Sequence, residues 1–211
     1  RDGRWAGLFG DIGAMGRAEG ELWWWRYVNE VLHEAGVPKG VFNVLNGLGP
    51  DVGAAMSAHP GIDMISFTGS SAVGRRVARE VGGRLGRTLL ELGGNNAIIL
   101  MEDADLDLAL PAILFGAVGT AGQRCTSTRR VLVHEAIADE VERRLVGAYA
   151  DIPIGDPMLD QTLCGPLISA KAVDGMQAAL DRVQTEGGKL LCGGGRVKLP
   201  GRLEKGHFVK P

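Results

Sequence analysis

One cysteine lies in surroundings that suit a reactive thiol. Cys125 follows the run Gly-Thr-Ala-Gly-Gln-Arg at residues 119–124, a small and polar stretch between a predicted helix and a predicted strand. Small neighbours leave space for a substrate, and Arg124 or a nearby helix start would favour the thiolate, which is the form that attacks an electrophile. The pattern allows covalent catalysis at Cys125, with a buried and inert thiol as the alternative. Cys164 and Cys192 lack such surroundings and are predicted to be packing residues.

A single carboxylate stands near the end of an apolar strand. Glu91 is the acidic residue of the run Thr-Leu-Leu-Glu-Leu-Gly-Gly at residues 88–94. We expect a carboxylate there to be partly desolvated, and it could then act as a general base. A salt-bridged residue at a strand end is the alternative.

Two glycine turns have the form of anion-binding turns. Gly47 and Gly49 follow one predicted strand and precede a helix, and Gly69 and Ser70 follow the next strand in the same way. The first amide N–H groups of a helix have no internal acceptor and carry partial positive charge, so they suit a pyrophosphate. Neither turn is a complete G-x-G-x-x-G motif, and ordinary turns of an α/β sheet are the alternative.

Several other chemistries are disfavoured by the residues present. His134 is followed by glutamate as in a zinc-protease helix, but Ala138 stands where the second imidazole is needed. Leu190 follows the only Gly-Lys pair, where a phosphate-binding P-loop requires serine or threonine. The remaining histidines have no cysteine or histidine partner at ligand spacing, and no G-x-S-x-G elbow occurs. The sequence therefore predicts no metal site and no esterase-type serine.

The elements that must hold these residues alternate between strand and helix. Helices are expected at residues 21–35, 51–58, 71–81, 106–118, 136–149 and 169–186, and strands at 41–45, 63–67, 88–92, 96–101, 130–134 and near 208. Residues 151–166 are expected to form a long ordered loop. This alternation with short glycine turns builds parallel sheets covered by helices, so we predict an α/β fold, with a change of domain near residues 91–94.

Composition narrows the class of protein. The chain has 211 residues, of which 45% are hydrophobic, and a net charge of −2, so a packed core is expected and a nucleic-acid or anionic-membrane surface is not. No apolar run approaches the roughly 20 residues that span a bilayer. Three cysteines make no disulfide framework, which favours the cytoplasm. The chain begins with Arg1 and no signal peptide, and we expect it to be a piece of a longer protein.

Three linked segments resemble the aldehyde dehydrogenase superfamily, most closely its α-aminoadipic semialdehyde dehydrogenase (antiquitin) branch. They are Phe-Thr-Gly-Ser-Ser-Ala-Val-Gly at 67–74, Leu-Glu-Leu-Gly-Gly-Asn-Asn at 90–96 and Gly-Gln-Arg-Cys-Thr at 122–126, followed by Gly-Asp-Pro at 155–157 and Gly-Pro at 165–166. The resemblance implies a partial fold of that family. Residues 22–92 would be the C-terminal part of an incomplete Rossmann-like NAD(P)-binding domain, and residues 93–211 the N-terminal part of an α/β catalytic domain. Residues 1–21 match nothing in the family.

The resemblance also implies roles for individual residues. Cys125 would be the nucleophile that forms a thiohemiacetal with a small aldehyde, and its N–H a donor to the oxyanion. Glu91 would activate the water that hydrolyses the thioester, and Thr126 would line the substrate pocket. The cofactor would be NAD, with NADP still open, and the residues near its pyrophosphate would be Gly49, Gly69, Ser70, Val73 and Gly74. The full-length form is expected to be a homo-oligomer.

Parts of the family's machinery lie outside this chain. The family's oxyanion-hole asparagine, its ribose-binding lysine and its nicotinamide-ribose glutamate have no counterpart here, and Asn95 and Asn96 belong to a different motif. We therefore expect the isolated chain to make little or no NADH. A non-catalytic remnant that only binds partners, and a thiol esterase that needs no cofactor, are the alternatives.

Overall fold

The computed structural model describes residues 19–45 and 47–211, with side chains described from residue 27 onward. Residues 1–21 were predicted to have no counterpart in the family suggested by the motifs, and residues 1–18 of this segment lie outside the described residues. The chain forms two compact units that divide between Gly93 and Gly94. Helices and strands alternate along most of both units, so the predicted α/β class is confirmed.

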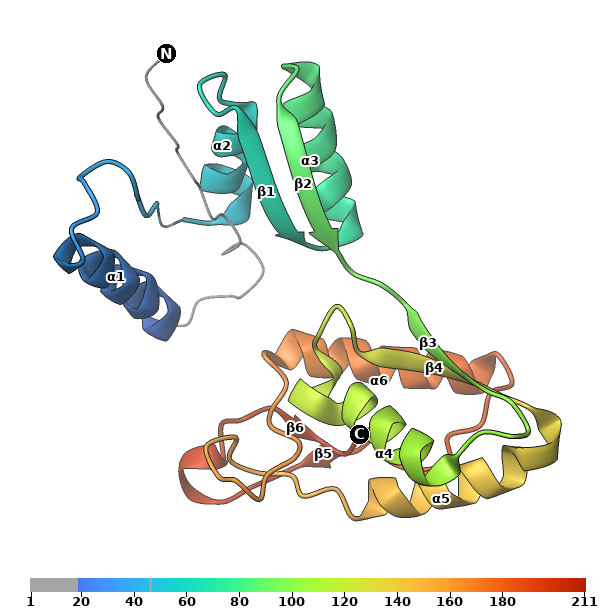
Figure 1. The fold of residues 1–211 in the computed structure, drawn as a ribbon. Coiled ribbons are helices and arrows are strands. Elements are labelled where there is room, and N and C mark those ends of the chain that lie inside the picture. Colours follow the sequence, from blue (N-terminus) through green and yellow to red (C-terminus); the bar gives the residue numbers. More distant parts are fainter. Residues whose placement is uncertain (1–18, 46) are drawn as a thin grey trace. The chain divides into compact units, whose positions relative to one another are not determined.

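The first unit is a βαβ arrangement preceded by one long helix and two short helical segments (Figure 1). Its elements are α1 (Glu19–Glu34), the helical turn η1 (Gly49–Gly53), α2 (Ala54–Ala58), β1 (Met64–Gly69), α3 (Ser71–Gly83) and β2 (Arg87–Leu92). β1 and β2 pair in parallel, with Met64 opposite Arg87 and Gly69 opposite Leu92, and α3 makes the crossover between them. A parallel pair needs such a crossover, which is why strand, helix and strand follow directly in the sequence.

One apolar cluster holds this unit together. Ile65 of β1 packs with Val77 and Val81 of α3, and Leu90 of β2 lies against them. The two valines are four residues apart and therefore share one face of the helix. Arg84, just after α3, donates from Nε to the carbonyl oxygen of Ser57 at 2.9 Å, which ties the end of α2 to the end of α3.

The strand expected at residues 41–45 does not form. The backbone there is irregular, and η1 and α2 begin only after it. A strand needs a neighbouring strand to accept and donate its backbone hydrogen bonds, and the described sheet of this unit contains only β1 and β2. The apolar run Val-Phe-Asn-Val-Leu is typical of a strand, but it does not show whether a partner strand is present to pair with it.

The second unit contains two further two-stranded sheets and three longer helices (Figure 1). Its elements are β3 (Asn96–Leu100), α4 (Leu106–Val118), η2 (Gly119–Gly122), β4 (Thr128–Val133), η3 (Glu135–Ile137), α5 (Ala138–Ala150), α6 (Ala170–Thr185), β5 (Arg196–Val197), η4 (Gly201–Leu203) and β6 (Phe208–Val209). β3 and β4 run parallel, whereas β5 and β6 run antiparallel. The chain between α5 and α6 forms only isolated bridges, as predicted for residues 151–166.

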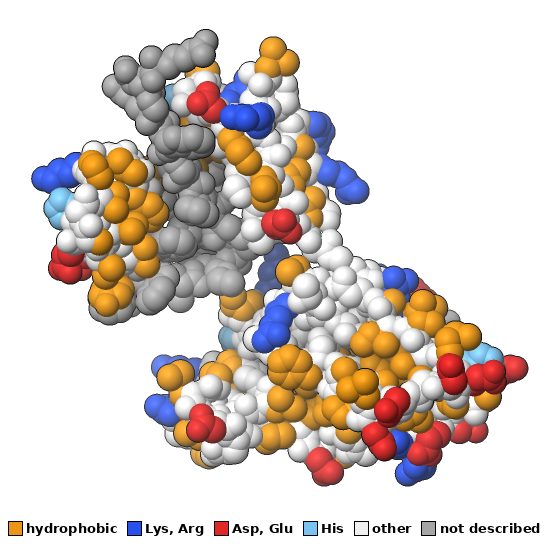
Figure 2. Space-filling view, in the orientation of Figure 1, with side chains coloured by type: hydrophobic (Ala, Val, Ile, Leu, Met, Phe, Trp, Pro, Cys, Tyr) orange, Lys and Arg blue, Asp and Glu red, His pale blue; other side chains and the backbone are white. Residues whose placement is uncertain are grey.

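The helices α4 and α5 cover one face of the β3–β4 sheet. Leu100, Leu110, Ile113 and Val141 form a buried cluster between them. Alternate residues of a strand point to opposite faces, and Ile99, which follows the inward-facing Ile98, is 67% exposed. Figure 2 shows that hydrophobic side chains also gather on the surface of this unit.

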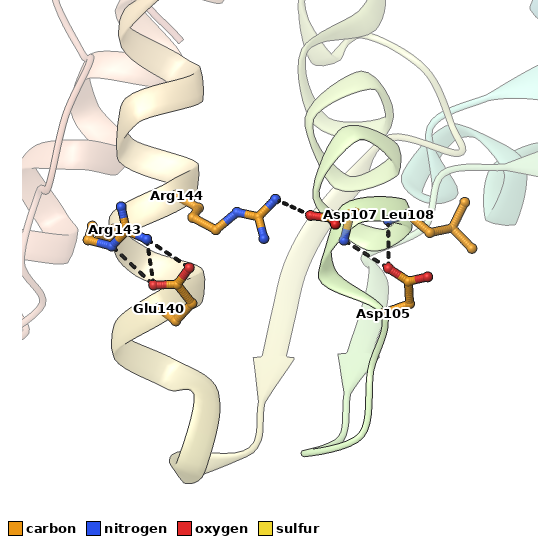
Figure 3. Close-up of polar contacts among 6 residues, drawn as sticks. All are labelled: Asp105, Asp107, Leu108, Glu140, Arg143 and Arg144. Atoms are coloured by element: carbon orange, nitrogen blue, oxygen red, sulfur yellow. Dashed lines mark hydrogen bonds and ion pairs between the residues drawn. The ribbon is translucent and has the colours of Figure 1, made fainter.

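The start of α4 is capped by an aspartate (Figure 3). The Asp105 carboxylate accepts hydrogen bonds from the backbone N–H groups of Asp107 and Leu108, at 3.0 and 3.2 Å. The Asp107 side chain forms an ion pair with Arg144 of α5 at 2.7 Å, and the Asp107 carboxylate is 88% exposed. The cap satisfies two backbone donors that the helix cannot satisfy itself.

Removing this cap is expected to destabilise the unit more than removing the ion pair. Asp105→Ala should lower the free energy of unfolding by about 1 kcal/mol, because two helix N–H groups lose their acceptor. Asp107→Ala removes an equal charge from the same helical turn and should cost about half of that or less, because exposed ion pairs contribute little. Urea denaturation followed by circular dichroism compares the two variants. Equal losses would show that charge, and not capping, is what Asp105 contributes.

Cys164 is a core residue, as predicted. Its side chain is fully buried against Val118 and Ile152, and desolvation raises the pKa of the Cys164 thiol above its ordinary value of 9.0. In the same cluster, desolvation and, secondarily, the nearby Cys192 raise the pKa of the Tyr149 hydroxyl above 10.0. A buried thiol held in its protonated form is a poor nucleophile, so Cys164 has a packing role.

Candidate active site

Cys125 lies in a tight turn between η2 and β4. The Arg124 N–H donates to the Ser127 hydroxyl at 3.1 Å, and the Ser127 N–H donates back to the Arg124 carbonyl at 3.3 Å, so the turn is closed. Ser127 is buried, whereas Cys125 is exposed. The Cys125 thiol is therefore accessible, which contradicts the alternative prediction that it is buried and inert. The turn leads directly into β4, so of the two features that could favour the thiolate, a nearby helix start or Arg124, no helix begins directly after Cys125.

The backbone before this turn adopts a conformation that is rare for residues other than glycine. Thr120 and Ala121 have φ values of 55° and 52°, and Gly122 follows with a φ of 69°. The left-handed region costs a non-glycine residue roughly 1–2 kcal/mol. Conformations of this kind persist where the surrounding contacts impose them, and they cluster at functional sites. The segment that leads to Cys125 is thus held by contacts and not by its own preference.

Gln123 supplies several of those contacts. Its side-chain nitrogen donates to the carbonyl oxygens of Thr120 and Pro166, at 3.2 and 3.3 Å. Its side-chain oxygen accepts from the N–H of Ile168 at 2.9 Å. One carboxamide therefore links the strained segment to the chain that precedes α6, using both ends of the amide.

Two further side chains hold the turn itself. The Arg129 guanidinium donates to the Gly122 and Arg124 carbonyl oxygens, at 3.5 and 3.3 Å. The Asn96 side-chain nitrogen donates to the carbonyl oxygens of Cys125 and Ser127, at 2.7 and 3.1 Å. Arg124 itself points elsewhere, since its guanidinium lies 5.7 Å from the centre of the Phe115 ring.

The side chains of Asn96 and Arg129 bind carbonyl oxygens of the turn, and two of its backbone N–H groups have no acceptor among the described residues. Among the described residues, no hydrogen-bond acceptor contacts the N–H of Cys125 or that of Thr126. Thr126 is exposed next to the thiol. Unpaired N–H groups beside a nucleophile are the kind of donor that can stabilise a negative oxygen formed at that sulfur.

Glu91 belongs to the first unit, in β2, whereas Cys125 belongs to the second. The candidate base and the candidate nucleophile therefore lie in different units, and neither unit contains both. Glu91 is exposed, which corrects the expectation of partial desolvation. Leu90 packs in the cluster with α3, so Glu91 faces the side of the sheet that α3 leaves uncovered.

The predicted cofactor residues 69–74 form the junction between β1 and α3. Gly69 ends β1, and Ser70 is the N-cap of α3, its hydroxyl accepting from the Val73 N–H at 3.3 Å. Gly74 is buried, and a Cβ there would lie 2.5 Å from the Leu92 side chain, so any larger residue would displace Leu92 where α3 packs on β2. The junction is thus a strand-to-helix turn with a capped helix of 13 residues behind it, and its use by a cofactor stays a prediction.

Gly49, the remaining predicted cofactor residue, is the first residue of η1. It follows Leu48, whose backbone is extended, and Pro50 comes directly after it. η1 continues into α2, and α2 in turn contacts α3. Gly49 and the β1–α3 junction therefore belong to the same unit.

Sequence reasoning missed the side chains that hold the turn of Cys125. Asn96, Gln123 and Arg129 were not assigned a role, although Gln123 and Asn96 stand inside the quoted motifs. Pairing the two strands expected at 96–101 and 130–134 would have brought the start of one beside residues 125–128, since β3 and β4 do pair in parallel. That pairing is the signal from which Asn96 could have been found.

Comparisons with curated proteins place this chain among aldehyde dehydrogenases. The α-aminoadipic semialdehyde dehydrogenase of Bos taurus is 47% identical over 186 residues, which cover 88% of this chain and 33% of that protein. A putative aldehyde dehydrogenase family 7 member A1 homolog from Dictyostelium discoideum is 45% identical over 186 residues, covering 88% of this chain and 36% of that protein. The chain thus spans about a third of the length of these relatives.

Solved structures agree on the fold. A betaine aldehyde dehydrogenase from Staphylococcus aureus, crystallised with NAD+, matches with a TM-score of 0.83 and 34% identity, over 88% of this chain and 37% of that one. A mutant of Aldehyde Dehydrogenase C from Pseudomonas syringae, in complex with NAD+ and octanal, matches with a TM-score of 0.81 and 39% identity, over 88% and 38%. The predicted partial fold is confirmed by these matches. Residues 19–211 also match the sequence model of the Aldehyde dehydrogenase family, and the chain belongs to that family.

Proposed function

We propose that this chain supplies the nucleophile and the general base of an enzyme that oxidises a small aldehyde, of the semialdehyde class, to its carboxylic acid with NAD+. NADP+ is the alternative cofactor. The observation that carries the proposal is the turn of Cys125, where an exposed thiol stands beside two backbone N–H groups without acceptors among the described residues. Covalent addition to a carbonyl needs both features at one place.

Cys125 and Glu91 act in succession on the aldehyde. The Cys125 thiolate forms a bond to the aldehyde carbon, and the carbonyl oxygen takes the negative charge and accepts hydrogen bonds from the N–H of Cys125. Loss of hydride from this thiohemiacetal restores the C=O bond and leaves a thioester. Glu91 then takes a proton from water, whose oxygen attacks the thioester carbon, and the acid leaves as the thiol is regenerated.

The junction at the start of α3 fits the cofactor's pyrophosphate. The backbone N–H groups of Ser71 and Ala72 contact no acceptor among the described residues, so both are available to a ligand. Phosphate oxygens are stabilised by such N–H groups and by the dipole of the helix. When bound, the nicotinamide ring of NAD+ accepts the hydride. We assign the binding of the cofactor to residues 22–92 and the covalent chemistry to residues 93–211.

The proposed substrate class and surroundings rest on relatives and on thiol chemistry. The similar proteins include semialdehyde dehydrogenases of Bos taurus and Rattus norvegicus. A catalytic thiol must stay reduced, which suits a compartment such as the cytoplasm. No described helix is long and apolar enough to cross a membrane. We also propose that the full-length enzyme is a homo-oligomer that binds no nucleic acid.

The test compares the 211-residue chain with the product of its complete coding region. Each is mixed with NAD+ and an aliphatic semialdehyde, NADH is followed by absorbance, and intact-mass and peptide spectra locate any acyl adduct. The complete product is expected to form NADH and to carry the adduct on Cys125, whereas the isolated chain, which spans about a third of the length of its relatives, is expected to form little NADH. Absence of both NADH and adduct in the complete product would refute the proposal. Ester hydrolysis that NAD+ does not change, without NADH, would favour a cofactor-independent thiol esterase.

A further inference from the structure

We propose that Asn96 is a positioning residue for the nucleophile: its carboxamide fixes the peptide group between Cys125 and Thr126 and so orients the Thr126 N–H as a second donor beside the thiol. The inference deepens the proposed function and rests on it for the chemistry at Cys125.

The contacts of Asn96 use both of its donors. The side-chain nitrogen donates at 2.7 Å to the Cys125 carbonyl and at 3.1 Å to the Ser127 carbonyl, so both N–H bonds of the amide are occupied. Asn96 is the first residue of β3 and pairs with Thr128, the first residue of β4. The amide is thus anchored at the edge of the sheet and reaches across to the turn.

Planarity of the peptide bond turns this contact into an orientation. The Cys125 C=O and the Thr126 N–H belong to one planar, trans peptide group and point in opposite directions. A donor that holds the carbonyl therefore also sets the direction of the N–H. The preceding peptide group is held similarly, because the Arg124 carbonyl accepts from Arg129 and from the Ser127 N–H. The carbonyls of Arg124 and Cys125 are thus both held, whereas the N–H groups of Cys125 and Thr126 contact no acceptor among the described residues.

Gly94 leaves the room that the Asn96 amide needs. A Cβ atom on Gly94 would lie 2.9 Å from the Asn96 side-chain oxygen and 3.7 Å from its nitrogen. Moving the side-chain oxygen away would also shift the nitrogen of the same amide, which donates to the Cys125 and Ser127 carbonyls. The glycine two residues before Asn96 is therefore part of the same arrangement.

The bulge in the strand pair adds a second hold on the turn. The register of β3 and β4 shifts between Asn96 and Ala97, which leaves Arg129 as an extra residue on β4. Arg129 is the residue whose guanidinium reaches the Gly122 and Arg124 carbonyls. Bulges redirect side chains next to functional sites, and here the extra residue and Asn96 hold neighbouring peptide groups.

The experiment separates reactions that need oriented N–H groups from those that do not. Acylation of Cys125 by p-nitrophenyl acetate passes through an oxyanion, whereas alkylation by iodoacetamide is a direct displacement without one. Asn96→Asp keeps the shape of the side chain but presents carboxylate oxygens to two carbonyl oxygens. We expect acylation to slow about tenfold, alkylation to change less than about threefold, and the exchange of the Arg124 and Ser127 amide protons to quicken about tenfold.

Two further variants of the 211-residue chain complete the design. Asn95→Asp adds the same charge one residue earlier, where no described side-chain hydrogen bond is lost, and should resemble the original protein in all three measurements. Gly94→Ala crowds the amide without removing it and should change the measurements in the same direction as Asn96→Asp. A thermal melt of each variant establishes that it is folded.

Each outcome decides the proposal. If Asn96→Asp and Asn95→Asp behave alike, or if acylation and alkylation fall together with the melting temperature, the positioning role is wrong. If the original Cys125 is acylated no faster than a free thiol of equal alkylation rate, the proposed function fails instead. In that case the exchange of the Arg124 and Ser127 amide protons still tests the role of Asn96. Faster exchange in Asn96→Asp would support the proposal that Asn96 orients the turn, and unchanged exchange would overturn that proposal.

Discussion

Cys125→Ala is expected to lower NADH formation by the product of the complete coding region by about a thousandfold or more, because the covalent route disappears with the sulfur. The adduct should vanish from the mass spectrum in the same variant. The measurement is the initial rate of NADH absorbance at saturating aldehyde and NAD+, together with peptide mapping after acid quenching.

Cys192→Ala provides the matched control for the cysteine substitution. Cys192 is partly exposed, it contributes to the raised pKa of Tyr149, and it makes none of the hydrogen bonds that hold the turn of Cys125. Its removal should leave the rate within about twofold, since surface substitutions away from a site change little. Activity that survives in Cys125→Ala but is lost in Cys192→Ala would transfer the nucleophile's role to the other cysteine.

Glu91→Gln is expected to separate the two halves of the reaction in the complete product. Forming the thioester consumes no water, so a first burst of NADH should remain. Hydrolysis needs a base to take a proton from water, and general bases typically contribute about 10²- to 10⁴-fold. The steady-state rate should therefore fall by about a hundredfold or more, and the acyl adduct on Cys125 should accumulate. Rapid-mixing absorbance measures the burst, and intact-mass spectra measure the adduct.

Glu80→Gln is the control for the glutamate substitution. Glu80 is exposed on α3 of the same unit, so its removal tests the loss of one negative charge from that surface. It should leave burst and steady state unchanged. Loss of the burst together with the steady-state rate in Glu91→Gln would mean that Glu91 supports the fold of β2 and is not the base.

The elements that sequence predicted well are those whose signals are local. The helix expected at 106–118 has these bounds in the structure, because Asp105 supplies the cap and Gly119 follows the last turn. β2 and β3 differ from the expected strands by one residue at one end, and β1 begins one residue later and ends two residues later than expected. The strand expected at 41–45 failed for the opposite reason, since pairing depends on a partner that no local pattern can supply.

The candidate site divides in the same way. The exposure of Cys125 agrees with the small, polar residues around it, and Ser70 caps α3 where the turn pattern indicated a helix start. Glu91 was expected to be partly desolvated because its neighbours are apolar. Side chains of a strand alternate between its two faces, so Leu90 and Leu92 are partly buried while Glu91 between them is exposed. Asn96 was missed because its two acceptors are 29 and 31 positions away and meet it only through the pairing of β3 with β4, which the pattern of either strand alone does not specify.

The amide that holds the Cys125 carbonyl also bears on how long the protein keeps its properties in storage. Asparagine side chains are among the heat-labile groups of proteins, and hydrolysis of the Asn96 carboxamide would produce the same carboxylate as Asn96→Asp. Ageing would then degrade the nucleophile's surroundings while the thiol stayed intact and titratable. Thiol counts would overestimate the competent fraction of an old sample, and the ratio of acylation to alkylation would report it directly.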